Sequence, residues 1–354
     1  MSKFLSQRLS ALTEYVPGEQ PRDKKYIKLN TNESPFPPSA KAIEAVTKAE
    51  LSDLRLYSDP ECKLLKEEIA KYYGVDSQNV FVSNGSDEAL NFFFMAFCDS
   101  EKEVCFPDIS YGFYKVFADL YNLKYEQIPL KDDFAIDVND YLDKGKNIVI
   151  ANPNAPTGMA LDISEIEKIV SSNRDSVVVI DEAYVDFGGE SAVELTKKYS
   201  NLMVVQTFSK SRSLAGARLG FAIADSEIIK DLEKIKFSTN PYNINRITLV
   251  LGRVAIADRE YFEKNILLIK EAREYTAKEL TRLGFTVLNS KANFVFAKSD
   301  KISGLELYKK LKDRGILVRH FEKERISDFN RITIGTMEDM KKLISEAEDI
   351  LKNL

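Results

Sequence analysis

The sequence contains one histidine and three cysteines, and this scarcity excludes several kinds of chemistry. A lone histidine, His320, argues against a Ser-His-Asp triad and against a zinc cluster, so proton transfer has to come from other side chains. Cys62, Cys98 and Cys105 show no close metal-binding spacing, and an odd number of cysteines argues against a disulfide framework. We therefore expect buried free thiols and no bound metal.

The sequence also lacks a surplus of one charge and any long apolar segment. Its 50 Lys and Arg residues are interspersed with 55 Asp and Glu residues, for a net charge of −5, which predicts no surface that attracts nucleic acid or acidic lipid. No run of about 18 apolar residues could span a membrane, and the first residues lack the apolar core of a secretory signal. We expect a cytoplasmic protein that binds anionic ligands locally.

The length of the chain predicts two domains. Its 354 residues exceed the roughly 250–300 residues at which a single hydrophobic core stops growing. From 78 to 225, short apolar runs alternate with helical patterns, whereas long charged helices dominate after 246. We expect a large domain over 33–245, and a small α+β domain formed by 1–32, which includes an N-terminal arm, and by 246–354.

The expected strands of the large domain are apolar throughout, which is typical of a mostly parallel sheet covered by helices on both faces. They span 79–83, 147–151, 176–180, 202–206 and 219–223. Helices are expected at 86–97, where apolar residues recur at helical spacing, and after Asp162, which opens a capping box with Glu165. In the small domain we expect a helix at 260–283 and strands at 284–288 and 293–297.

Polar residues follow three of these strands at the point where each strand ends. The segments are Asn-Pro-Asn-Ala-Pro-Thr-Gly at 152–158, Asp-Glu-Ala-Tyr at 181–184 and Thr-Phe-Ser-Lys-Ser-Arg at 207–212. Because the carboxyl ends of parallel strands share one edge, where open α/β sheets bind their ligands, these segments should meet. The side chains expected to converge are those of Asn154, Asp181, Tyr184 and Lys210.

A lysine, a carboxylate and a tyrosine at one site match the needs of pyridoxal 5′-phosphate, which binds a lysine as a Schiff base and needs a partner for its pyridinium nitrogen. Lys210 would carry the cofactor and, once displaced by substrate, would act as a general base. Asp181 would keep the ring nitrogen protonated. Tyr184 would hydrogen-bond the phenolic oxygen and stabilise its anion. These three residues form the expected catalytic set.

The phosphate of this cofactor would need donors of its own. A helix beginning at Ser86, directly after Gly85, would offer unpaired N–H groups and the positive end of its dipole. Ser209 and Arg218 would add donors, and Tyr111 would stack on the ring. The residues expected to bind the cofactor are Gly85, Ser86, Asp87, Glu88, Tyr111, Asn154, Asp181, Tyr184, Thr207, Ser209, Lys210 and Arg218.

Each signal has a plainer explanation when it is taken alone. A lysine often ends a strand in solvent, and the segment 152–158 has the composition of an ordinary turn. Arg319 and Arg331 would by themselves suit surface ion pairs, which contribute little to stability. The joint occurrence of the motifs, in order and at successive strand ends, favours the functional interpretation.

The motifs at 152–158, 181–187 and 207–220 resemble those of the fold-type I, class II aminotransferases, which depend on pyridoxal phosphate. Within that group the chain most resembles the histidinol-phosphate aminotransferase family, from the segment 29–33 to the segment 330–336, and thus over essentially its whole length. The resemblance implies an aspartate-aminotransferase-like α/β fold. It also implies a transfer of the amino group of L-histidinol phosphate to 2-oxoglutarate, which gives imidazole acetol phosphate and L-glutamate in histidine biosynthesis.

The resemblance implies further site residues that the motifs themselves do not show. Tyr57 would reach across a dimer interface to the phosphate of the partner's cofactor, which implies a homodimer. The implied substrate-binding residues are Tyr15, Asn32, Glu33, Arg319 and Arg331. The two arginines would suit a donor that carries a phosphate and an acceptor that carries carboxylates.

One position departs from the usual pattern of the family. Many relatives have a second asparagine before Pro-Thr-Gly, which bonds the phenolic oxygen of the cofactor, and here that position is Ala155. Either Asn154 takes over this bond or Tyr184 makes it alone.

Two other activities of the same fold are open alternatives, an aromatic-amino-acid aminotransferase and a phosphothreonine-type decarboxylase. A regulator with an aminotransferase-like sensor would need a DNA-binding module, for which the roughly thirty residues before the first family motif leave no room. An inactive scaffold would not need Lys210 and Asp181.

Overall fold

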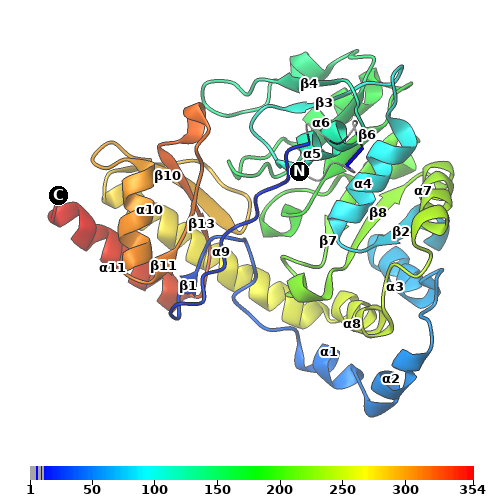
Figure 1. The fold of residues 1–354 in the computed structure, drawn as a ribbon, viewed down its shortest axis with the longest axis horizontal. Helices are drawn as coiled ribbons and strands as arrows, with labels where there is room; N and C mark the ends of the chain where they lie inside the picture. The colour runs from blue at the N-terminus through cyan, green and yellow to red at the C-terminus, as the bar shows by residue number, and fades with distance from the viewer. Residues whose placement is uncertain (1–4, 7–8, 10–11) are drawn as a thin grey trace.

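Two large sheets of different size and one two-stranded sheet organise the computed structural model, which describes residues 5–6, 9 and 12–354 (Figure 1). The larger sheet has seven strands in the order β2-β8-β7-β6-β5-β3-β4. These strands are β2 (Val80–Ser83), β3 (Val104–Pro107), β4 (Tyr125–Ile128), β5 (Asn147–Ala151), β6 (Val178–Asp181), β7 (Leu202–Thr207) and β8 (Gly220–Ala224). Strand β8 runs antiparallel to both of its neighbours, whereas β3 to β7 pair in parallel, so the expected mostly parallel sheet is confirmed.

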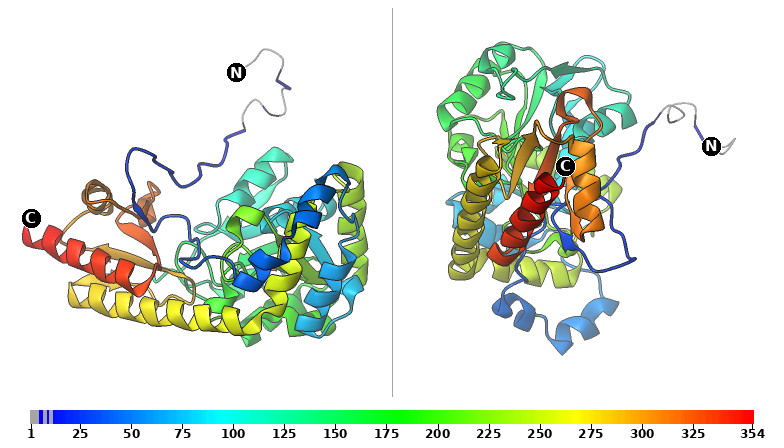
Figure 2. Two further views of the ribbon diagram at one scale, coloured as in Figure 1. Left: turned by 90° about the horizontal axis from the view of Figure 1, so that it is seen from below. Right: turned by 90° about the vertical axis from the view of Figure 1, so that its left-hand side faces the viewer.

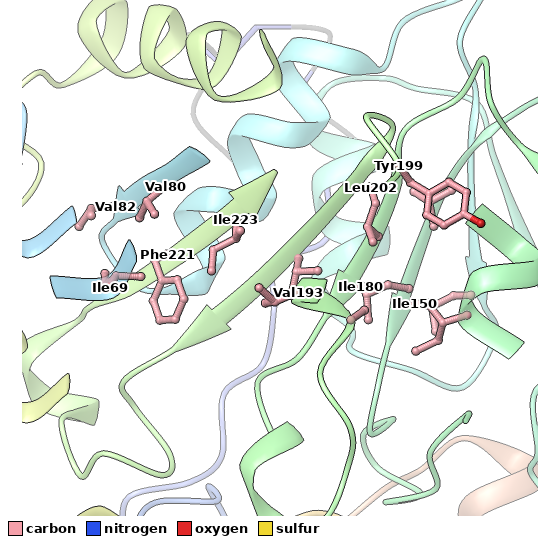
Figure 3. Packing of buried hydrophobic residues seen from close by; sticks show 14 of the residues in the cluster. Ile69, Val80, Val82, Ile150, Ile180, Val193, Tyr199, Leu202, Phe221 and Ile223 are labelled. Carbon is pink, nitrogen blue, oxygen red and sulfur yellow. The ribbon is translucent and has the colours of Figure 1, made fainter. Parts of the chain in front are cut away.

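The strands of this sheet are apolar throughout because both of its faces are buried. Along β5, Ile148 and Ile150 face one hydrophobic cluster, which Figure 3 shows in part, and Val149 and Ala151 face another. The first cluster is completed by α3 (Lys63–Tyr73), α6 (Ile163–Ser172) and α8 (Arg246–Ala257). The second is completed by α4 (Ser86–Phe97), α5 (Phe113–Leu120) and α7 (Ser226–Thr239). The result is a three-layer α/β unit.

The smaller sheet is antiparallel and carries its helices on one face. Its order is β12-β13-β10-β9, with β9 (Phe285–Val287), β10 (Phe294–Ser299), β12 (Arg319–His320) and β13 (Phe329–Thr333). The helices are α9 (Arg259–Arg282), α10 (Gly304–Asp313) and α11 (Met337–Lys352), which lie side by side in Figure 2. Ile332 of β13 packs in the core beneath them. Because side chains alternate along a strand, Arg331 and Thr333 lie on the opposite face, toward the larger sheet.

Short elements connect the two sheets. Strand β1 (Ile27–Lys28) pairs in parallel with β11 (Ile316–Leu317) beside the smaller sheet. The chain then passes through α1 (Ala40–Ala45) and α2 (Lys48–Ser52) to the larger sheet. Helix α8 begins at Arg246, in the part of the chain that was expected to form the small domain, but it packs against α1 and α3. The division of the chain into domains at 33–245 and 246–354 stays a prediction.

Most of the expected elements have the expected positions. The five expected strands of the large domain correspond to β2, β5, β6, β7 and β8, and the capping box of Asp162 and Glu165 is present at the start of α6. Strands β3 and β4 were not expected, and β4, with the sequence Tyr-Glu-Gln-Ile, is a partly exposed edge strand without an apolar run. Cys62, Cys98 and Cys105 are free and buried, as expected.

None of the helices in the described part of the chain is long and apolar enough to span a membrane. The expected cytoplasmic location stays a prediction.

Candidate active site

A cavity of about 870 Å³ lies at the carboxyl edge of β5, β6 and β7, and the smaller sheet closes its other side. Most of the site residues expected from the sequence line it. They are Tyr15, Asn32, Glu33, Ser86, Asp87, Tyr111, Asp181, Tyr184, Thr207, Ser209, Lys210, Arg218, Arg319 and Arg331. Four other expected residues, Gly85, Glu88, Asn154 and Tyr57, are not part of the wall. The three strand-end motifs therefore meet in one place.

Lys210 lies in the loop that joins β7 to the antiparallel strand β8. Its Nζ donates a hydrogen bond to the backbone oxygen of Thr31, at 3.2 Å. Burial, and then the positive charge of Arg331, lower the pKa of Lys210 to about 8. An amine with this pKa is partly unprotonated near neutral pH, so it can attack a carbonyl carbon and accept a proton.

Asp181 is the last residue of β6 and is 4% exposed. Its two carboxylate oxygens accept hydrogen bonds from the Tyr114 hydroxyl, at 2.7 Å, and from the Ala183 backbone N–H, at 3.2 Å. Burial raises the pKa of Asp181 to about 6, and the two donors oppose this rise. The group is therefore mostly ionised at neutral pH and can hold a cationic partner in the cavity. Sequence reasoning missed Tyr114, whose only signal was its place three residues after Tyr111.

Tyr184 lies three residues after Asp181 in the sequence and faces the same cavity. Its hydroxyl oxygen accepts a hydrogen bond from Asn32 Nδ2, at 2.9 Å. Burial raises the pKa of Tyr184, while the charge of Arg331 and the Asn32 hydrogen bond act in the opposite direction. The phenol is therefore protonated at neutral pH and can serve as a hydrogen-bond donor.

The beginning of α4 forms a place for an anion beside these residues. Gly85 precedes the helix with φ 75° and provides no side-chain cap, so the first N–H groups of α4 are open to a ligand. A Cβ on Gly220 would lie 2.4 Å from the backbone nitrogen of Ser86, so only glycine lets β8 approach this helix end. Arg218 adds a guanidinium group beside this helix start, and its Nη2 lies 2.9 Å from Asp87 Oδ2.

Two hydroxyl groups and a tyrosine complete the wall of the cavity on the side of the larger sheet. The Thr207 hydroxyl lies 3.0 Å from the Ser209 hydroxyl and accepts a hydrogen bond from the Ser209 backbone N–H, at 3.1 Å. Tyr111 donates a hydrogen bond to Asp87 Oδ1, at 2.8 Å, and this bond fixes its ring beside the start of α4. The wall thus combines hydroxyl donors with an aromatic surface.

The smaller sheet and the N-terminal segment bring further groups to the cavity. Arg331 Nη2 donates to the backbone oxygen of Asn30, at 3.0 Å, whereas its Nε is buried and has no hydrogen-bond partner within residues 5–6, 9 and 12–354. Arg319 donates to the backbone oxygens of Val16 and Pro17, both at 3.2 Å. Arg331 therefore has more unused hydrogen-bonding capacity for an anionic ligand than Arg319.

Tyr15 and Glu33 line the cavity, and their side chains contact other groups of the protein. The Tyr15 ring packs on Phe113, with 4.3 Å between the ring centroids. Glu33 forms an ion pair with Lys28, at 2.6 Å, and accepts a hydrogen bond from the Thr31 hydroxyl. These contacts attach the N-terminal segment to the rim of the cavity.

The side chains of Asn154, Glu88 and Tyr57 have other partners. Asn154 donates to the Ile109 backbone oxygen, at 2.9 Å, and accepts from the Ser110 hydroxyl, at 2.8 Å, behind the cavity wall. Glu88 accepts hydrogen bonds near the start of its own helix. Tyr57 is 78% exposed and stacks on Tyr242, and neither residue lines this cavity. Their roles at the site stay predictions.

Comparison with known proteins identifies the family of the chain. The family described as aminotransferase class I and II matches residues 24–346, which is most of the chain. The chain belongs to this family. A histidinol-phosphate aminotransferase of Brachyspira hyodysenteriae is 50% identical over 354 residues, which are 100% of each chain. One of Clostridium beijerinckii is 50% identical over 353 residues, 100% of this chain and 99% of the relative.

Solved structures of aminotransferases share the fold of this chain. The histidinol-phosphate aminotransferase of Sinorhizobium meliloti, in complex with pyridoxal-5′-phosphate, superposes with a TM-score of 0.86 at 22% sequence identity, over 93% of this chain and 92% of that one. A tetra mutant of the aspartate aminotransferase of Thermus thermophilus superposes with a TM-score of 0.83 at 18% identity, over 99% of this chain and 100% of that one. The aspartate-aminotransferase-like fold expected from the sequence is confirmed.

Proposed function

We propose that this chain is a pyridoxal-phosphate-dependent transaminase that moves the amino group of L-histidinol phosphate to 2-oxoglutarate. The observation that carries the proposal is the convergence of Lys210, Asp181 and Tyr184 in one cavity next to an anion-binding helix start. The names of the relatives at 50% identity over the full length support the choice of substrate.

The residues in the cavity fit this cofactor by charge and by hydrogen-bonding capacity. Lys210 would hold it covalently, Asp181 would pair with its ring nitrogen and Tyr184 would donate to its phenolic oxygen. The start of α4, with Ser209 and Arg218, would hold its phosphate. When bound, the cofactor supplies an electron sink for the bonds at the substrate Cα. Lys210 would then move a proton from Cα to the cofactor carbon.

Arg331 is the residue best placed to bind the substrate anion. Its buried Nε has no partner within the described ranges, and an unsatisfied buried donor is unfavourable by about 1–3 kcal/mol. A phosphate or a carboxylate would satisfy it through the planar guanidinium fork. The same group can therefore hold histidinol phosphate in one half of the reaction and 2-oxoglutarate in the other.

A turnover assay tests the proposed reaction directly. Purified protein loaded with pyridoxal phosphate is given histidinol phosphate and 2-oxoglutarate, and glutamate is measured. We expect glutamate to form faster than with phenylalanine as the donor. A preference for phenylalanine would favour the aromatic-amino-acid alternative, and release of carbon dioxide from phosphothreonine would favour the decarboxylase.

The rate at which the empty protein takes up the cofactor should depend on pH through Lys210. Only the unprotonated amine attacks the cofactor aldehyde, and the pKa of Lys210 is lowered to about 8. We expect the rate to rise about tenfold per pH unit below pH 8 and to level off above it. The growth of the near-visible absorption band after mixing measures this rate. A rate that still rises steeply above about pH 9.5 would mean that the amine has its ordinary pKa.

We propose that the chain forms a homodimer in which Tyr57 contributes to the partner's site. Tyr57 and its stacking partner Tyr242 are 78% and 43% exposed, and Leu51, Leu54 and Leu56 nearby in sequence are about half exposed. Exposed apolar groups gathered in this way are typical of a protein interface. A second copy of the chain, seated there, would bring Tyr57 close to a cavity other than its own.

Mixed dimers test the contribution of Tyr57. We expect Tyr57→Phe to weaken cofactor binding by about tenfold, because one hydrogen bond to a charged group is lost. A dimer of one Tyr57→Phe chain and one Lys210→Ala chain has one site with both residues intact, if Tyr57 acts across the interface. Half of the sites should then bind the cofactor with the parent affinity, as measured by fluorescence titration. No recovery in the mixture would mean that Tyr57 acts within its own chain.

A further inference from the structure

A chain of three hydrogen-bonded side chains connects the smaller sheet to Tyr184. The Asn32 backbone N–H donates to the Thr333 hydroxyl, at 3.0 Å, and that hydroxyl donates to Asn32 Oδ1, at 2.9 Å. Asn32 Nδ2 donates in turn to the Tyr184 hydroxyl, at 2.9 Å. Asn32 and Thr333 are 1% and 2% exposed, so water does not compete for these bonds.

The Thr333 hydroxyl decides which way the Asn32 amide points. It has a single hydrogen, and Asn32 Oδ1 is its acceptor. If the amide were turned over, Nδ2 would face Thr333, and the buried hydroxyl hydrogen would have no acceptor among the described residues. A buried donor without a partner is unfavourable by about 1–3 kcal/mol. The amide therefore presents Nδ2, a donor, to Tyr184.

The orientation of the amide fixes the direction of the Tyr184 hydrogen. Because its oxygen accepts from Asn32, the hydroxyl cannot donate back to the same group. No other protein acceptor for this hydrogen lies within residues 5–6, 9 and 12–354, and Tyr184 faces the cavity. Ala155, which also lines the cavity, has no side-chain hydrogen-bonding group to replace Tyr184.

We propose that Asn32 is a positioning residue that, held by Thr333, directs the Tyr184 hydrogen into the cavity, where it donates to the phenolic oxygen of the cofactor. This inference rests on the proposed function, because it concerns a group bound in the same cavity. Asn32 itself acts through Tyr184. By donating to the phenol, it also makes the phenol a stronger donor, since hydrogen bonds in a chain reinforce one another.

The backbone dihedral angle and the backbone oxygen of Asn32 both restrain the position of its amide. Asn32 has φ 56°, in the left-handed region, which asparagine tolerates better than most residues. Its backbone oxygen accepts from Asn293 Nδ2, at 3.1 Å. Thr333 ends β13 and Asn293 directly precedes β10, both of the smaller sheet, whereas Tyr184 follows β6 of the larger sheet. The alignment of the phenol therefore depends on the contact between the parts of the chain that carry the two sheets.

Spectroscopy of the loaded protein without substrate tests this inference. The near-visible absorption band changes with pH as the nitrogen bonded to the cofactor gains a proton, and a donor at the phenolic oxygen lowers the pH midpoint. We expect Tyr184→Phe to raise this midpoint. Asn32→Gly, which removes the amide but accepts the positive φ, should raise it by about half a pH unit. The double variant should show no more than the Tyr184→Phe shift, because Asn32 acts only through Tyr184.

Variants of Thr333 give a second test that does not depend on the fold around Asn32. Thr333→Val should raise the midpoint, and Thr333→Ser, which keeps the hydroxyl, should restore it. Asn330→Ala is the matched control, since Asn330 is buried on the same strand but bonds the Gly304 backbone oxygen on the opposite face. Its midpoint should equal that of the parent, whatever its thermal stability.

Two results would overturn the inference. One is a parent-like midpoint in both Asn32→Gly and Thr333→Val, and the other is a double variant whose shift is the sum of the two single shifts. Failure of the parent protein to bind pyridoxal phosphate at all would instead overturn the proposed function, and the inference with it.

Discussion

Replacing Lys210 with alanine is expected to lower the rate of transamination by roughly 10⁴-fold or more, because one side chain supplies both the covalent attachment of the cofactor and the general base. The variant should still bind pyridoxal phosphate through Asp181, Tyr184 and the start of α4. It should no longer be possible to fix the cofactor to the chain with borohydride. Glutamate formation and the mass of the reduced protein measure the two effects.

The expected loss is specific to this lysine. Lys230→Ala, which removes a side chain that pairs with Glu227 on the exposed surface of α7, is the matched control and should keep the parent rate. If Lys210→Ala turned over at more than about one hundredth of the parent rate, another group would have to be the base.

Replacing Asp181 with asparagine is expected to lower the rate by about 10²–10³-fold, the range found when one electrostatic partner of a developing charge is removed. The amide has the same shape, and it can still accept from the Tyr114 hydroxyl through its oxygen. It cannot pair with a cationic ring nitrogen, so the cofactor would lose most of its capacity to accept electrons from the substrate. Single-turnover kinetics with histidinol phosphate measure the chemical step without product release.

The next residue in the sequence is the control for this variant. Glu182 is 2% exposed, and its carboxylate accepts hydrogen bonds from Ser191, Gln206 and the Ala192 backbone N–H, away from the cavity. Glu182→Gln should reduce thermal stability and leave the chemical step unchanged. If Glu182→Gln lost as much rate as Asp181→Asn, the loss in Asp181→Asn would come from disturbed packing at this strand end and not from the missing partner of the ring nitrogen.

The central part of the site was predictable from the sequence because its position follows from the topology. Asp181 ends one parallel strand, and Lys210 follows the end of the next, so both had to lie at the same edge of the sheet. The apolar strands were recognisable because both faces of the sheet are buried. Local patterns were enough for these features.

Contacts between distant parts of the chain were not predictable in the same way. Nothing in the sequence near Asp181 indicates that Tyr114 bonds its carboxylate, because the helix that carries Tyr114 is placed by packing against the sheet. The sequence also left open whether Asn154 bonds the phenolic oxygen of the cofactor or Tyr184 makes that bond alone. In the structure the Asn154 amide donates to the Ile109 backbone oxygen, and the amide that reaches Tyr184 comes from Asn32.

The order of the site residues along the chain has a consequence for synthesis on the ribosome. Thr31 and Asn32 are made near the beginning, whereas Arg331 and Thr333, which complete the other wall, lie on one of the last strands. A nascent chain that already contains Lys210 has its reactive amine but not the charge and the hydrogen bonds that the late strand provides. The charge of Arg331, which with burial lowers the pKa of Lys210, can therefore act on this amine only after the later strand has been made and packed.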